Sequence, residues 1–275
     1  MRREAASFNF FYHHAIVMID AEIISLLDSE AARINSEAFI ADDPVQFPRR
    51  FESLPDIEIA SLLCSSIAWG NRRMICRDCD RMLALMDNDP HAYVMDRGYE
   101  DLPDEINIHR TFFGRNFKHF LRGLRIVYSL FGSLQGFASA AGIATSPHPS
   151  WSLVEALNAV LADANGGVGD SRCLPLNLAT TALKRVNMAL RWLVRNDGIV
   201  DLGVWNVITP AQLFIPLDVH VGNVARSLGL VSRKANDRRT VEELNAILVT
   251  LRPHDPVFYD YALFGIGMEA KNLNK

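Results

Sequence analysis

The residues of this chain best placed for chemistry are a carboxylate, Asp218, and an amine, Lys184. Asp218 follows an apolar approach in the segment 216–221, and apolar residues then recur at 217, 221, 224, 225 and 228. This is the spacing of one buried helix face. We therefore expect Asp218 at a helix N-cap, where its carboxylate accepts backbone N–H groups and stays ionised beside the positive helix end. A purely structural cap satisfies the same spacing.

Lys184 stands in a second helix, expected over residues 179–195. It is the only lysine between Lys118 and Lys234. On a helical wheel the apolar residues share one face, and the opposite face carries Lys184, Asn187, Arg191 and Arg195. A stripe of three cations and an amide suits contact with phosphate groups. It equally suits a helix face that is merely exposed to solvent.

Composition limits the class of protein. The chain has 275 residues, of which 49% are hydrophobic and 22% charged, enough to build a large packed core. Its net charge is −4, so affinity for nucleic acid would have to come from a local basic patch. No run approaches the roughly 18 apolar residues of a membrane span. We see no signal peptide, and four cysteines make no disulfide framework, so we expect a cytoplasmic location.

Helical periodicity dominates the chain, and the strict alternation of strands is scarce. One nearly all-apolar helix is expected over residues 57–69, with Asp56 as its N-cap. About a dozen short helices with almost no strand predict an all-α globule. We expect one compact unit over 1–275 made of two helical lobes. Lobe A would span 56–165, and lobe B would combine 1–55 with 166–275.

Cys76 and Cys79 form a CxxC pair on an expected helix. Zinc needs two more ligands, and neither a second pair nor a nearby histidine offers them. A structural role is therefore expected for both thiols, and we expect no metal and no cofactor.

The order of these segments resembles the helix-hairpin-helix DNA glycosylase superfamily, which includes endonuclease III and the 8-oxoguanine glycosylases. The resemblance rests on a core helix ending in the residues IAWGNR (67–72), a lysine-bearing helix, and the residues PLDVHV (216–221) opening another helix. From about Asp42 the chain also resembles a bacterial family of unknown function placed near that superfamily. The phrases LKRVNMALRWLVRNDGIVDLGVW, IPLDVHVGNVARSLGL and DPVFYDYALFGIG carry this second resemblance.

The resemblance implies roles for particular residues. Asp218 would stabilise the oxocarbenium-like sugar as the base leaves. Lys184, which precedes Asp218 by 218 − 184 = 34 residues, would attack the sugar and form a Schiff base in a bifunctional enzyme. His220 would be a positioning residue, and Trp69 or Asn71 would be the wedge that enters the base stack. The expected contacts to nucleic acid are Arg191, Arg195, His220, Asn223, Arg226, Trp69 and Asn71.

Two features depart from the superfamily pattern. The usual hairpin has glycines that bind phosphate through backbone N–H groups, whereas residues 174–177 read LPLN and hold none. No cysteine follows Cys173, so the iron–sulfur cluster of some endonuclease III relatives is not expected.

Three hypotheses follow from these observations. The first is a base-excision DNA glycosylase, with or without lyase activity, whose partner is a damaged duplex. The second is a non-catalytic nucleic-acid-binding protein that keeps the glycosylase fold, which the missing glycines and the acidic pI favour. The third is an interaction protein or an enzyme acting on another substrate, because a fold does not determine a function.

Overall fold

The computed structural model describes residues 19–273. Its longer helices are α1 (Ala21–Ile34), α3 (Leu54–Ser66), α4 (Arg72–Leu85), α6 (Gly114–Phe131), α8 (Pro149–Asp163), α9 (Lys184–Val194), α10 (Val219–Ser227), α11 (Arg238–Leu251) and α12 (Tyr259–Leu273). The shorter helices are α2 (Glu37–Ile40), α5 (Pro90–Met95), α7 (Leu134–Ala140) and the 3-10 turns η1 (Pro44–Gln46), η2 (Pro48–Arg50), η3 (Gly98–Asp101), η4 (Ile143–Thr145), η5 (Pro210–Gln212) and η6 (Pro256–Phe258).

The described chain is all-α apart from one small hairpin, as the periodicity predicted. Strands β1 (Asn107–His109) and β2 (Phe112–Phe113) pair antiparallel just before α6. Within residues 19–273 we find no helix with the length and apolar character needed to cross a membrane.

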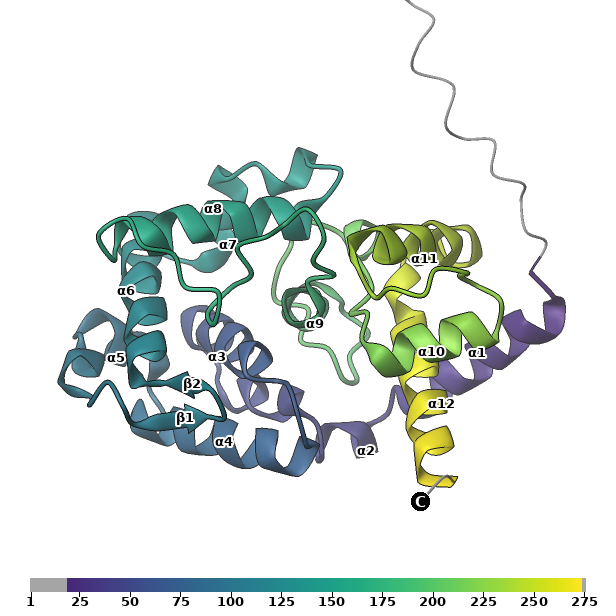
Figure 1. Ribbon diagram of the computed structural model, residues 1–275, viewed down its shortest axis with the longest axis horizontal. Coiled ribbons are helices and arrows are strands. Elements are labelled where there is room, and N and C mark those ends of the chain that lie inside the picture. The colour runs from purple at the N-terminus through teal and green to yellow at the C-terminus, as the bar shows by residue number, and fades with distance from the viewer. Residues whose placement is uncertain (1–18, 274–275) are drawn as a thin grey trace, which may run out of the picture.

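Helix α9 lies near the centre of the molecule. It is seen almost end-on in Figure 1, with α3 to α8 on one side and α1, α10, α11 and α12 on the other. Every residue from Val186 to Val194 is buried, and α9 packs against α3 and α8. A helix buried on all faces belongs to the interior of a protein. The lobe boundaries 56–165 and 1–55 plus 166–275 stay a prediction.

Helix α3 begins earlier than the sequence suggested. Its N-cap is Ser53, whose hydroxyl accepts a hydrogen bond from the Asp56 backbone N–H at 3.3 Å, so the expected Asp56 cap is wrong. Pro55 lies in the first turn, where its fixed φ angle and missing N–H are tolerated. The Asp56 carboxylate instead accepts from the backbone N–H of His91, which ties α3 to α5.

Helix α9 begins later than expected, at Lys184 rather than near residue 179. The residue before it, Leu183, has φ +50°, a left-handed conformation that no helix continues through. The segment leading to it is made of turns. This late start makes Lys184 the first residue of the helix.

A buried carboxylate, Glu58, joins α3 to two distant segments. Its side chain accepts from the backbone N–H groups of Leu134 and Gln135 at 2.7 and 2.8 Å. It also accepts from the indole of Trp205 at 2.8 Å and the hydroxyl of Tyr128 at 3.1 Å. Burial raises the pKa of Glu58, and these four donors oppose that rise. Glu58 therefore fixes the start of α7 and the segment around Trp205.

We expect Glu58→Gln to destabilise the protein by about 2–3 kcal/mol, because the amide nitrogen would face two donors and leave them unsatisfied. Glu52→Gln, at an exposed carboxylate just before α3, is the matched control and should change stability by less than about 0.5 kcal/mol. Urea unfolding of both variants measures this difference. Equal midpoints for the two variants would show that the Glu58 contacts contribute nothing.

Candidate functional site

A cavity of about 620 Å³, here called the central cavity, opens between α4, α9, α10, α12 and η1. It brings together side chains from segments far apart in the sequence. Six of the residues predicted for a site from the sequence line it, namely Lys184, Arg191, Asp218, His220, Trp69 and Asn71. Other lining residues that matter below are Phe39, Asp43, Arg72, Arg185, Asp260 and Phe264.

The predicted cap at Asp218 is confirmed. Asp218 precedes α10, and its Oδ1 accepts from the backbone N–H groups of His220 and Val221 at 2.9 and 3.0 Å. The amide of Asn236 donates to the Asp218 carbonyl oxygen at 3.2 Å and holds the turn. Among residues 19–273, Oδ2 has no hydrogen-bond partner. One oxygen of this half-buried carboxylate is therefore structural, and the other is free to meet a ligand in the cavity.

Lys184 lines the same cavity from the first position of α9. Its side chain is half-buried and makes no ion pair or hydrogen bond within the described part of the chain. A cation at a helix N-terminus is opposed by the helix dipole. The position of Lys184 therefore does not serve helix stability, and its amine is available to a ligand.

Two further carboxylates, Asp43 and Asp260, line the cavity and are almost fully buried, with exposed fractions of 7% and 6%. Burial raises the pKa of Asp260 to about 6. Arg191 and Lys184 oppose this increase, and Asp218 adds to it.

Asp43 is more completely engaged than Asp260. Its Oδ1 accepts from the backbone N–H of Val45 at 3.1 Å, and its Oδ2 lies 3.4 Å from the guanidinium of Arg72. Burial raises the pKa of Asp43, and Arg72 opposes this change.

Aromatic rings and guanidinium groups form the walls of the cavity. The guanidinium of Arg185 lies 5.0 Å from the ring centre of Trp69. At another part of the wall, the guanidinium of Arg72 lies 5.5 Å from the ring of Phe39 and 4.9 Å from that of Phe264. Flat, apolar and cationic surfaces of this kind suit a planar aromatic ligand attached to an anionic chain.

A buried pair behind the wall holds Trp69 in place. His109 is fully buried, with Nε2 2.9 Å from the Trp69 carbonyl oxygen and Nδ1 2.7 Å from Asp78 Oδ2. The edge of the Trp69 ring packs on the His109 ring at 4.7 Å. These contacts fix Trp69 in the cavity wall, and its role as a wedge stays a prediction.

Gly70, which follows Trp69, has φ +109°, and a Cβ atom there would lie 2.5 Å from Arg110 Nη1. Only glycine fits this position without displacing Arg110. Asn71 caps α4, with its Oδ1 accepting from the Met74 backbone N–H at 3.2 Å.

The sequence reading missed Arg185. It adjoins Lys184, and within residues 19–273 its guanidinium has no carboxylate partner, donating instead to the Ser66 carbonyl oxygen. Burial lowers the pKa of Arg185. In the sequence, Arg185 is marked only as a second cation next to Lys184. On the helical wheel it lies on neither the apolar face nor the face that carries Lys184, Arg191 and Arg195.

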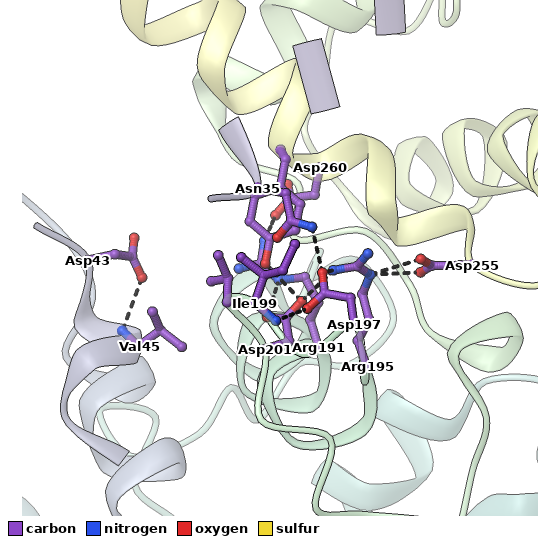
Figure 2. A network of polar contacts seen from close by, with 12 residues as sticks. Asn35, Asp43, Val45, Arg191, Arg195, Asp197, Ile199, Asp201, Asp255 and Asp260 are labelled. Atoms are coloured by element: carbon purple, nitrogen blue, oxygen red, sulfur yellow. Dashed lines mark hydrogen bonds and ion pairs between the residues drawn. The ribbon is translucent and has the colours of Figure 1, made fainter. Parts of the chain in front are cut away.

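The expectation of an exposed cationic stripe on α9 is wrong. Arg191 and Arg195 are 4% and 3% exposed, and Asn187 is 1% exposed. Figure 2 shows the two guanidinium groups enclosed by carboxylates, namely Asp197, Asp201, Asp255 and Asp260. The physical reason is that these acids, which come from two other segments, balance the charges and make burial of both arginines tolerable. Arg195 does not reach the cavity, and neither guanidinium is free to contact phosphate.

The two residues expected to bind nucleic acid further along α10 lie outside the central cavity. Arg226 donates to Asn223 Oδ1 at 2.9 Å and to Asn236 Oδ1 at 3.1 Å. Asn236 in turn donates to the Asp218 carbonyl oxygen, so Arg226 is joined to the Asp218 turn through one amide. Arg226 has no carboxylate partner in the described residues, which leaves its charge unneutralised.

All four cysteines are free thiols. Cys79 is fully buried, and burial raises its pKa well above the ordinary value. In the described range, no group of three or more His, Cys, Asp or Glu residues is arranged to hold a metal ion.

Comparison with known proteins gives one match. No curated protein and no solved structure is significantly similar to the chain. Residues 43–269 match a family described as "Protein of unknown function (DUF2400)". This range includes Lys184, Asp218 and Asp260, so the central cavity falls within the matched region apart from Phe39 and Lys271. The chain therefore belongs to the family described as Protein of unknown function (DUF2400).

Proposed function

We propose that the protein is a base-excision DNA glycosylase of the helix-hairpin-helix kind, which cleaves the N-glycosidic bond of a damaged base and uses Lys184 as a Schiff-base nucleophile. The observation that carries the proposal is that an amine without a partner and a carboxylate with one free oxygen, both judged within residues 19–273, line one cavity, each at the start of a helix. We also propose a cytoplasmic location, in keeping with the four thiols that form no disulfide.

The carboxylate suits the developing charge of such a reaction. As the bond between C1′ and the base breaks, the sugar acquires oxocarbenium character and positive charge. Asp218 is held by two backbone N–H groups through Oδ1, which leaves Oδ2 oriented without reorganisation. A carboxylate fixed before the reaction stabilises the transition state more than a mobile one does.

The amine suits covalent capture of the same carbon. A neutral lysine amine can attack the sugar carbon and form a Schiff base, which splits a difficult hydrolysis into two easier steps. Lys184 has no protein partner to compete for its lone pair within residues 19–273. Asp218 lines the same cavity and can receive the proton that the amine gives up.

The walls suit an extruded base. An enzyme that acts on a base removes it from the stack and holds it between aromatic or apolar side chains. The Trp69 ring, covered by the guanidinium of Arg185, offers such a surface. The second wall, at Phe39, Arg72 and Phe264, offers another. Drug-sized ligands occupy sites of roughly 300–1,000 Å³, and the central cavity of about 620 Å³ lies within this range.

The first experiment tests the wild-type protein. Duplexes carrying 8-oxoguanine, uracil or an abasic site are incubated with the protein and sodium borohydride, which reduces a Schiff base to a stable cross-link. Base release is followed separately by strand cleavage in alkali. We expect release of at least one base together with a cross-linked product. If no duplex shows base release or cross-linking, the proposal is rejected.

The second candidate is a non-catalytic nucleic-acid-binding protein with this fold. The glycine-free segment 174–177 and the acidic pI favour it over a catalytic enzyme, because the segment departs from the hairpin of the glycosylases. Its experiment is binding of an undamaged duplex at 50 and 200 mM salt. A binder that uses a few phosphate contacts weakens steeply over this range, whereas a protein without such contacts shows no change. This candidate is supported if the protein binds the duplex in a salt-dependent way but shows no base release and no trapping.

A further inference from the structure

The central cavity holds a third ionisable group that the roles of Lys184 and Asp218 leave unused. Asp260 is the second residue of α12 and lines the cavity. One of its oxygens, Oδ2, accepts from the guanidinium of Arg191. Within residues 19–273 its Oδ1 makes no hydrogen bond. The carboxyl group is thus anchored on one side and open to a ligand on the other.

We propose that Asp260 is a catalytic general acid that gives its proton to the departing base; this inference rests on the proposed function. Three groups would then divide the work. Lys184 supplies the electron pair, Asp218 meets the positive charge on the sugar, and Asp260 neutralises the negative charge on the leaving base. General acid catalysis of this kind typically contributes about 10²–10⁴-fold to a rate.

The step balances in atoms and charge. The bond between C1′ and the base nitrogen breaks, and its electron pair stays on the base. The Asp260 proton passes to the base, which leaves neutral, and Asp260 becomes a carboxylate. Lys184 gives one proton of its ammonium group to Asp218, and the freed amine forms the new bond to C1′, so that the adduct carries the positive charge. Before the next turnover Asp218 returns this proton to water and Asp260 takes one up.

The surroundings of Asp260 keep a proton on it at a higher pH than an exposed aspartate would allow. Burial raises its pKa to about 6, so the acid form is present at pH 6 and below and declines as the pH rises further. Burial disfavours the charged carboxylate and is the main cause of this change.

Several other charged groups face α12 and enter the same balance. Asp218 and Asp201 favour the protonated form of Asp260, whereas Arg191 and Lys184 favour the ionised form. His220 packs on α12 at Gly267. Further charged groups near α12 are Asp28, which accepts from Tyr259, Arg33, which pairs with Glu269, and Arg72, which stacks on Phe264. Asp43 lines the cavity, Arg195 stacks on Tyr261, and Arg252 and Asp255 pair beside η6.

The test separates departure of the base from attack on the sugar. Asp260→Asn keeps the shape of the side chain but cannot donate a carboxylic proton. We expect its base release to fall about 100-fold in single-turnover assays. Borohydride trapping on an abasic-site duplex, in which no base has to leave, should stay within about twofold of wild type. A purely structural role for Asp260 would lower both reactions together.

Asp255→Asn is the matched control, because Asp255 belongs to the same buried network through Arg195 but does not line the cavity. It should keep base release at the wild-type rate. Equal losses in Asp255→Asn and Asp260→Asn would overturn the inference, and so would an unchanged rate in Asp260→Asn.

The wild-type protein gives a second measurement that does not depend on the folding of a variant. Its base release should decline as the pH rises above about 6, the pKa of Asp260, and trapping on the abasic site should lack this decline. The same pH dependence in both reactions would overturn the inference. If wild type releases no base at all, the proposed function fails as well, whereas an active wild type with an unaffected Asp260→Asn rejects only the role of Asp260.

Discussion

Replacing Lys184 with alanine is expected to abolish borohydride trapping on every duplex that wild type cross-links. The cross-link requires an amine at the sugar carbon, and within residues 19–273 Lys184 is the only lysine other than Lys271 that lines the central cavity. In the proposed mechanism the Schiff base forms on the Lys184 nitrogen, so the expected loss is complete rather than partial. Gel electrophoresis of the reduced product measures it directly.

The fold should tolerate this change. Lys184 makes no ion pair or hydrogen bond in the described chain, and a cation at a helix start is unfavourable. We therefore expect the stability of Lys184→Ala to stay unchanged or to rise by about 0.3–1 kcal/mol. Lys234→Ala, at an exposed lysine outside the cavity, is the control and should trap like wild type. Undiminished trapping by Lys184→Ala would place the nucleophile elsewhere and remove the amine from the mechanism.

Replacing Asp218 with asparagine is expected to slow base release by about 10²–10³-fold. Asparagine caps helices as well as aspartate does, so its side-chain oxygen can still accept from the N–H groups of His220 and Val221. What disappears is the negative charge on Oδ2, which faces the sugar in the proposed mechanism. Single-turnover release of the base measures the loss, and binding of the duplex should remain.

The chain offers a closely matched control for this variant. Asp237 is the N-cap of α11 and accepts from the Thr240 backbone N–H at 3.0 Å, but it does not line the cavity. Asp237→Asn should therefore release base at the wild-type rate. Wild-type activity in Asp218→Asn would mean that Asp218 is only a cap. An equal loss in both variants would mean that the assay reports helix stability rather than chemistry.

The positions of individual helix ends show how far local sequence reasoning reaches. The Asp218 cap was predicted because a cap depends on one side chain and the apolar spacing that follows it. The start of α9 was not predicted, because Leu183 adopts a left-handed conformation that its side chain does not favour by itself. A residue takes such a conformation only when the surrounding structure stabilises it.

The two arginines of α9 show where the same reasoning ends. A helical wheel separates the polar from the apolar face, but it does not say whether the polar face meets water or another segment. Here the acids of segments 197–201 and 255–260 meet Arg191 and Arg195 and bury them. Only contacts between distant residues decide whether this face is buried. The residues predicted to form a phosphate-binding surface therefore lie in an internal network of ion pairs.

The sequence by itself determined the all-α class and the cap at Asp218, since each depends on residue type and near-neighbour spacing, whereas the role of Lys184 is implied by the resemblance to the glycosylases. Only the tertiary structure decided that Lys184 and Asp218 line one cavity, that Asp43, Arg185 and Asp260 join them, and that Arg191 and Arg195 are enclosed. The physical reason is that burial and long-range pairing depend on which segments pack together, and that is set by the whole chain at once.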